Sequence, residues 1–106
     1  MEQLKFKLKN FDSKFDFRFK KISPIDILSL QTQIDLENME KTKKLFSFIL
    51  ENTEVTNNGD LWVNVKEKKV DEYHPEGMES NLKAMNEICI KFINDIIKPV
   101  FTESSR

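Results

Sequence analysis

The sequence predicts a small α+β protein in which an N-terminal antiparallel β-hairpin packs, as two layers, against about three α-helices. Two observations carry this prediction. Apolar and polar residues alternate over much of residues 1–21, whereas apolar residues recur every three to four positions in later segments. Alternation is typical of strands that bury one face, and the longer period is typical of amphipathic helices. At 106 residues the chain is expected to form a single domain, residues 1–106, with one hydrophobic core.

Two alternating runs near the N-terminus predict the hairpin. Their apolar positions are Leu4, Phe6 and Leu8 in the first run and Phe15, Phe17 and Phe19 in the second. Residues 10–14 lie between the runs and are polar enough to reverse the chain. Because a lone hairpin is marginal in water, its apolar face needs a cover. We therefore expect Phe17 and Phe19 to be buried against Phe92 of the last helix.

The middle of the chain predicts helices. Ser23 can accept hydrogen bonds from the first free amides of a helix, and Pro24 lacks the amide hydrogen that would be unpaired there. This helix is expected over residues 24–37, and a second apolar pattern predicts a helix over residues 40–52. The sequence leaves open whether the two segments are separate helices or one bent helix.

A short strand with its own turn is expected next. Residues 57–60, Asn-Asn-Gly-Asp, predict a tight turn, since Asn and Gly tolerate left-handed backbone conformations. Residues 61–65 predict a strand, for which residues 70–73 are the candidate partner. A break follows at residues 74–77, which read His-Pro-Glu-Gly.

The last helix is expected from about Ser80 to Lys98, because Pro99 disfavours helix in the residue before it. Its predicted core face comprises Ala84, Met85, Ile88, Cys89, Phe92, Ile93 and Ile96. Ile90 and Ile97 project among polar residues instead. One interpretation is a stripe that docks another chain. The interpretation that we favour is ordinary packing, with the helix between two layers or with Ile97 under the C-terminal tail, because scattered exposed apolar residues are normal.

Charge and composition argue against several classes of protein. The chain has a net charge of −1, with +4 on residues 1–21 and therefore −5 on the remainder. This balance gives no long-range attraction to nucleic acid, and the phenylalanine face of the hairpin is expected beneath helices. No run is long enough for a membrane span, and the N-terminus lacks the apolar segment of a signal peptide. A lone cysteine, Cys89, excludes an internal disulfide, so we expect a cytosolic protein.

The sequence does not support catalytic or metal-binding chemistry. One histidine, His74, and one cysteine, Cys89, do not make a zinc site, and Cys89 falls on an apolar helix face where thiols are inert. Two acidic clusters are interpreted as solvated charge; they are Asp35, Glu37 and Glu40, and Asp71, Glu72, Glu76 and Glu79. With only two glycines there is no glycine-rich phosphate loop. The protein is therefore expected to be non-enzymatic, with no cofactor and no metal.

Four features follow one another along nearly the whole chain. They are the charged alternating N-terminus, the helix entry SPIDIL at residues 23–28, the tryptophan after a turn in GDLW at residues 59–62, and the final helix, which closes as FINDIIKPVF at residues 92–101 before Ser104 and Ser105. In this order they resemble the small tail assembly chaperones of long-tailed bacteriophages and prophages. The resemblance implies a non-enzymatic protein of the host cytoplasm that binds the long, helical tape measure protein while the tail tube polymerises around it.

The resemblance also implies the short form of a frameshifted pair, whose longer form recruits the tail tube protein. The sequence leaves open whether the protein forms a homo-oligomer. Apolar residues near one end are the candidate partner-binding positions, namely Met78, Met85, Ile90, Ile97, Val100 and Phe101. Two alternative functions remain. One is a small nucleic-acid-binding regulator that uses the basic hairpin, and the other is a ring-forming head or tail structural protein.

Overall fold

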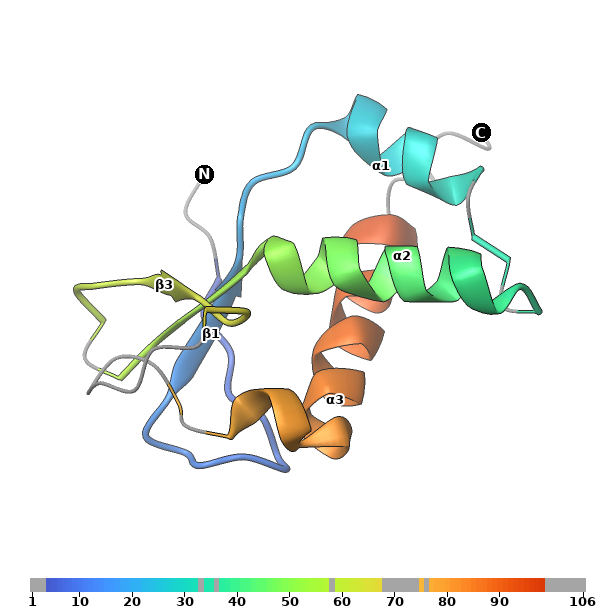
Figure 1. The fold of residues 1–106 in the computed structure, drawn as a ribbon. Helices are drawn as coiled ribbons and strands as arrows, with labels where there is room; N and C mark the ends of the chain where they lie inside the picture. Colours follow the sequence, from blue (N-terminus) through green and yellow to red (C-terminus); the bar gives the residue numbers. More distant parts are fainter. Residues whose placement is uncertain are drawn as a thin grey trace.

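The structure is a computed structural model that describes residues 4–32, 34–35, 37–57, 59–67, 75 and 77–98. A three-stranded antiparallel sheet and three α-helices confirm the predicted α+β class (Figure 1). The elements are β1 (Asp16–Phe19), α1 (Pro24–Gln31), α2 (Met39–Glu51), β2 (Thr53–Thr56), β3 (Val63–Asn64), a 3-10 turn η1 (Met78–Ser80), α3 (Leu82–Phe92) and a π-helical turn η2 (Ile93–Ile97).

The N-terminal segment (residues 4–9) forms the outer arm of the predicted hairpin, but it pairs with β1 at one position only. Phe6 and Phe17 exchange both backbone hydrogen bonds, with N to O distances of 2.9 and 2.8 Å. The ladder does not extend to Leu4, which we expected on the buried face and which is 87% exposed. The prediction of a full alternating strand here is therefore wrong, although the reversal between the two arms is present.

The middle strand of the sheet, β2, is absent from the sequence-based prediction. It follows α2 directly and pairs antiparallel with β1 on one side and β3 on the other. Its buried positions include Thr53 and Thr56 beside Val55, so it lacks the apolar alternation that indicates a half-buried strand. β3 lies within the strand expected at residues 61–65, but its partner is β2. The expected partner, residues 70–73, lies outside the described residues.

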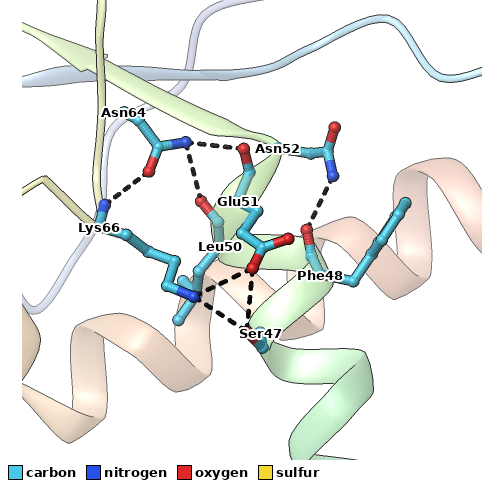
Figure 2. A network of polar contacts seen from close by, with 7 residues as sticks. All are labelled: Ser47, Phe48, Leu50, Glu51, Asn52, Asn64 and Lys66. Atoms are coloured by element: carbon cyan, nitrogen blue, oxygen red, sulfur yellow. Dashed lines mark hydrogen bonds and ion pairs between the residues drawn. The ribbon is translucent and has the colours of Figure 1, made fainter.

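β3 is anchored to the end of α2 through side chains (Figure 2). The Nδ2 atom of Asn64 donates to the carbonyl oxygens of Leu50 and Glu51 at 3.4 and 2.7 Å. The Lys66 ammonium lies 3.3 Å from the Glu51 carboxylate and 2.9 Å from the Ser47 hydroxyl oxygen. These contacts bond carbonyls of the last turn of α2, and they place a cation at the negative end of the helix.

The two segments predicted as helices in the middle of the chain are two separate helices. α1 begins as expected, with the Ser23 hydroxyl accepting from the Asp26 amide at 3.2 Å, and it ends at Gln31, earlier than predicted. α2 has its own N-terminal cap, because the Asn38 side chain accepts from the Lys41 amide at 3.1 Å. In Figure 1, α2 crosses α3, and α1 lies at the edge of the molecule.

The core lies between the sheet and the helices, and phenylalanines form much of it. Phe17 and Phe92 are fully buried, which confirms their prediction. Phe19 is only half-buried, and its ring meets Phe92 edge-on at a centroid distance of 5.2 Å. Around this centre α2 packs against α3, and α1 packs against η2. The face of β1 that carries Phe17 therefore faces inward.

The π-helical turn η2 changes which side chains the end of the last helix buries. The amide of Lys98 donates to the carbonyl of Ile93, five residues earlier, where an α-helix would use four. The additional residue in this turn moves the side chains that follow by about 100° relative to a regular α-helix. Ile97 is consequently 4% exposed, whereas Ile90 is 49% exposed. The alternative of a shared exposed stripe is wrong.

Candidate partner-binding groove

A groove of about 340 Å³ lies between the N-terminal segment and the last helix. The N-terminal segment contributes Phe6, Lys7 and Lys9, and α3 with η2 contributes Glu87, Ile90, Lys91, Asn94 and Asp95. Phe6 and Ile90 supply its apolar surface, and every other lining residue is polar or charged. The groove can therefore hold an apolar side chain between charged walls.

Glu87 lines the groove and holds the N-terminal segment. Its carboxylate accepts from the backbone amides of Lys9 and Asn10 at 2.7 and 3.1 Å, and from the Asn10 side chain at 3.1 Å. The Asn81 side chain adds a bond to the Asn10 carbonyl at 3.0 Å. Because charge-assisted bonds to amides are strong, these contacts fix the N-terminal segment on α3. Glu87 is thus a positioning residue.

Charged side chains along the groove are partly neutralised within the protein. Lys91 lies 2.8 Å from the Asp95 carboxylate, and its ammonium is 5.1 Å from the centroid of the Phe6 ring. Lys7 lies 3.0 Å from the Asp16 carboxylate. Within the described part of the chain, the ammonium of Lys9 has no ion-pair partner. The positive charge left uncompensated is therefore on the side of the N-terminal segment.

Among the described residues, the predicted partner-binding positions are not brought together on the surface. Ile90 lies in the groove, where it is half-exposed beside Asn94. Met78 and Ile97 are in the core, with 1% and 4% of their surface exposed, so they present no docking surface in this structure. Met85 is half-buried against the core. The remaining two positions, 100 and 101, lie outside the described residues.

Phe6 is the groove residue whose role the sequence did not indicate. It was expected to be one of several equivalent core positions of the hairpin. Its ring instead packs against Phe17 and Phe19, with centroids 6.0 and 5.0 Å apart, and it also reaches the groove beside Ile90. The early departure of the chain from β1 leaves this ring uncovered on one side, and alternation alone gives no signal for that departure.

The outer face of the sheet is polar. Arg18 pairs with Glu54 at 2.9 Å across β1 and β2, and its guanidinium carbon lies 4.2 Å from the centroid of the Trp62 ring. Trp62 is thus already stacked by an arginine. Since Phe17 is buried on the opposite face, it is not available to stack on nucleic-acid bases.

The structure also bears on the expectations about the thiol, metal binding and membrane spans. Burial raises the pKa of the Cys89 thiol from 9.0 to about 11, which favours the unreactive thiol over the thiolate. Among the residues that the structure describes, no three His, Cys, Asp or Glu side chains gather in a way that could hold a metal ion. Across those same residues, no helix is both long and apolar enough to cross a membrane. His74 lies outside them.

Comparison with known proteins adds no relative. No family model matches the chain, and no curated protein or solved structure matches it either.

Proposed function

We propose that this protein is a non-enzymatic chaperone of phage tail assembly that holds the tape measure protein in the host cytoplasm. The order of its sequence features supports this proposal by its resemblance to such chaperones. The observation that carries it is the groove, where Phe6 and Ile90 offer apolar surface to another chain. A chaperone must cover apolar residues of its client, so it needs exposed apolar positions of its own.

The groove suits reversible holding. It is small, and its apolar pair is surrounded by charged side chains of both signs. Interfaces of this kind place an apolar anchor at the centre and a polar rim around it. A client bound by one or two anchors can leave when tail tube subunits begin to cover it. Recruitment of the tube protein by a longer, frameshifted form belongs to the same proposal.

Co-expression with a tape measure segment tests the proposal. The tagged protein should keep the segment soluble and co-purify with it, and Ile90→Asp should abolish both effects because it places a charge on the apolar anchor. The matched control is Leu82→Asp, which makes the same change at a residue that is 78% exposed at the start of α3 and outside the groove. Circular dichroism confirms folding of both variants.

The proposal is wrong if the wild-type protein leaves the segment insoluble and uncaptured. A client that is held equally by the Ile90 and Leu82 variants would retain the function but move the site away from the groove. Gene neighbourhood gives an independent check, because a very long reading frame of tape measure type is expected immediately downstream.

A further inference from the structure

The N-terminal segment presents an open strand edge. Phe6 directs both its amide and its carbonyl towards β1, where they bond to Phe17. Because neighbouring residues of an extended chain direct these groups to opposite sides, those of Lys5 and Lys7 point away from β1. Within the described residues, no backbone hydrogen bond of Lys5 or Lys7 occurs. Two residues of the edge can therefore accept another strand.

This open edge faces the groove. Lys9 lies on the same edge, two residues beyond Lys7, and donates its amide to Glu87 of α3 at 2.7 Å. Further along, Lys91 of α3 lies over the ring of Phe6. The helix thus runs beside the edge in the opposite direction. The two are joined at Glu87, and the groove continues beside Lys7 and Phe6.

Charge decides what kind of strand fits. The N-terminal segment carries three lysines and no acidic residue, and the ammonium groups of Lys5 and Lys9 have no ion-pair partner within the described part of the chain. Lysines on an edge oppose pairing with the same edge of a second copy. They favour acidic side chains on a strand placed beside them, since opposite charges across a strand pair stabilise it.

The two faces of the N-terminal segment carry different side chains, and this difference predicts the sequence pattern of an added strand. Lys5 and Lys7 project on the face opposite to that of Phe6, because side chains alternate along a strand. A strand added here would place one set of side chains beside the lysines and the other set beside Phe6 and Ile90. Acidic residues suit the first set and apolar residues the second.

We infer that the groove binds an extended segment of a partner protein, with alternating acidic and apolar residues, as an additional strand on the N-terminal segment. This inference rests on the proposed function, since it states how a client would be held, but it does not require the client to be a tape measure protein. The backbone amides and carbonyls of Lys5 and Lys7 make the main-chain bonds, and Ile90 contacts an apolar side chain of the segment.

The test uses a synthetic peptide in which aspartate and valine alternate over eight residues. Isothermal titration calorimetry should detect binding, and two-dimensional NMR should show shifts and slowed hydrogen exchange at the amides of Lys5 and Lys7. The decisive variants are Lys5→Pro and Lys5→Ala. Both remove the ammonium, but only proline removes the amide hydrogen, and an exposed edge tolerates it. Lys5→Pro should bind about tenfold more weakly than Lys5→Ala, because one backbone bond is lost.

Two control peptides complete the test. A lysine and valine peptide should not bind, and a peptide N-methylated at every amide should bind weakly because it cannot donate hydrogen bonds to the ladder. Equal binding of the two Lys5 variants, or of the N-methylated peptide, would overturn the inference. So would displacement of the peptide by an oligonucleotide, which would assign the edge to nucleic acid, or self-association of the protein through Lys5 and Lys7.

The failure of this inference can be told apart from failure of the proposed function. If the peptide does not bind while a tape measure segment is still captured in a manner that depends on Ile90, the function stands and strand addition is rejected. If neither the peptide nor the segment binds, both are rejected.

Discussion

Individual phenylalanines decide how the sheet and the helices are held together. Phe17 and Phe92 are inaccessible to solvent, while Phe19 is half-buried and its ring is edge-on to Phe92. Large aromatic side chains contribute more apolar burial than other residues of a core, and edge-on pairs add a favourable geometry. In a small protein, a few such side chains account for a large share of stability.

Truncation of a buried phenylalanine should cost far more than truncation of an exposed apolar residue. We expect Phe17→Ala and Phe92→Ala each to lower the free energy of unfolding by about 3–5 kcal/mol, since each leaves a cavity in the core. Ile25→Ala is the control, because this side chain is 78% exposed on α1. Urea denaturation followed by circular dichroism measures the difference. A midpoint for Phe17→Ala close to that of the control would place the phenylalanine face in solvent.

The Cys89 thiol should be nearly unreactive in the folded protein. Its pKa is raised to about 11 from 9.0 by burial, so little thiolate forms near neutral pH. A thiol-reactive dye at pH 8 should label the native protein slowly and the protein in urea rapidly. Labelling at equal rates would show that α3 opens readily.

Burial of Cys89 should also make the free energy of unfolding decrease at alkaline pH. The folded protein keeps the thiol proton to a higher pH than the unfolded chain does. The contribution of the protonated Cys89 thiol to the free energy of unfolding is therefore complete below the unfolded-state pKa of 9.0. It is lost as the pH rises through the folded-state pKa of about 11. Replacement by alanine removes this contribution to the pH dependence.

Among the elements, helices with strong local signals could be predicted and strands defined by tertiary pairing could not. Ser23 and Pro24 mark the start of α1 because capping depends on residues close in sequence. β2 has no such signal, since its buried positions include the hydroxyl-bearing Thr53 and Thr56. Its β-branched residues are a weak hint, but it becomes a strand because β1 and β3 pair with it.

The same limit applies to the groove. Ile90 was identified from the sequence because a side chain outside the apolar face of a regular helix is visible in the pattern. Ile97 satisfied that same criterion, yet η2 carries it into the core. A π-helical turn depends on packing around it, so helical periodicity could not predict where Ile97 points. Phe6 and Glu87 are far apart in the sequence, and only folding brings them to the same groove.

Substitutions at Ile90 and Ile97 should therefore differ in their effect on the free energy of unfolding. Ile97→Ala should lower the free energy of unfolding by about 2–5 kcal/mol, as for other buried isoleucines, because it leaves a cavity between η2 and α1. Ile90→Ala should change it by less than about 0.5 kcal/mol, as is usual for surface positions. Urea midpoints of the two variants give the comparison. Equal midpoints would indicate that the helix ends without the π-helical turn.

At the scale of the whole molecule, the position of the charges is more informative than the net charge. The net charge is only −1, yet the N-terminal segment is uniformly basic. On the outer face of the sheet, Arg18 is held by Glu54 and Trp62, and Lys7 is held by Asp16. Positive charge on this side is thus partly compensated. This arrangement favours a local, acidic partner over a long polyanion.

Nucleic acid should consequently bind weakly. We expect no complex with a single-stranded or double-stranded oligonucleotide tighter than the non-specific range of about 10⁻⁴ to 10⁻⁶ M at physiological salt. Fluorescence anisotropy with labelled oligonucleotides measures this. A submicromolar complex that weakens with salt, and that is lost when Lys5, Lys7 and Arg18 are changed to glutamate, would support the regulator function instead.

The bond from Lys9 to Glu87 also orders events during synthesis. It joins residues 78 positions apart, so the N-terminal segment is fixed in place by a residue that is synthesised much later. Contacts between distant residues form late because the intervening chain must first be brought together. The groove is thus absent from any nascent chain that has not yet produced α3. A partner that needs this groove can therefore bind only after translation has passed Glu87.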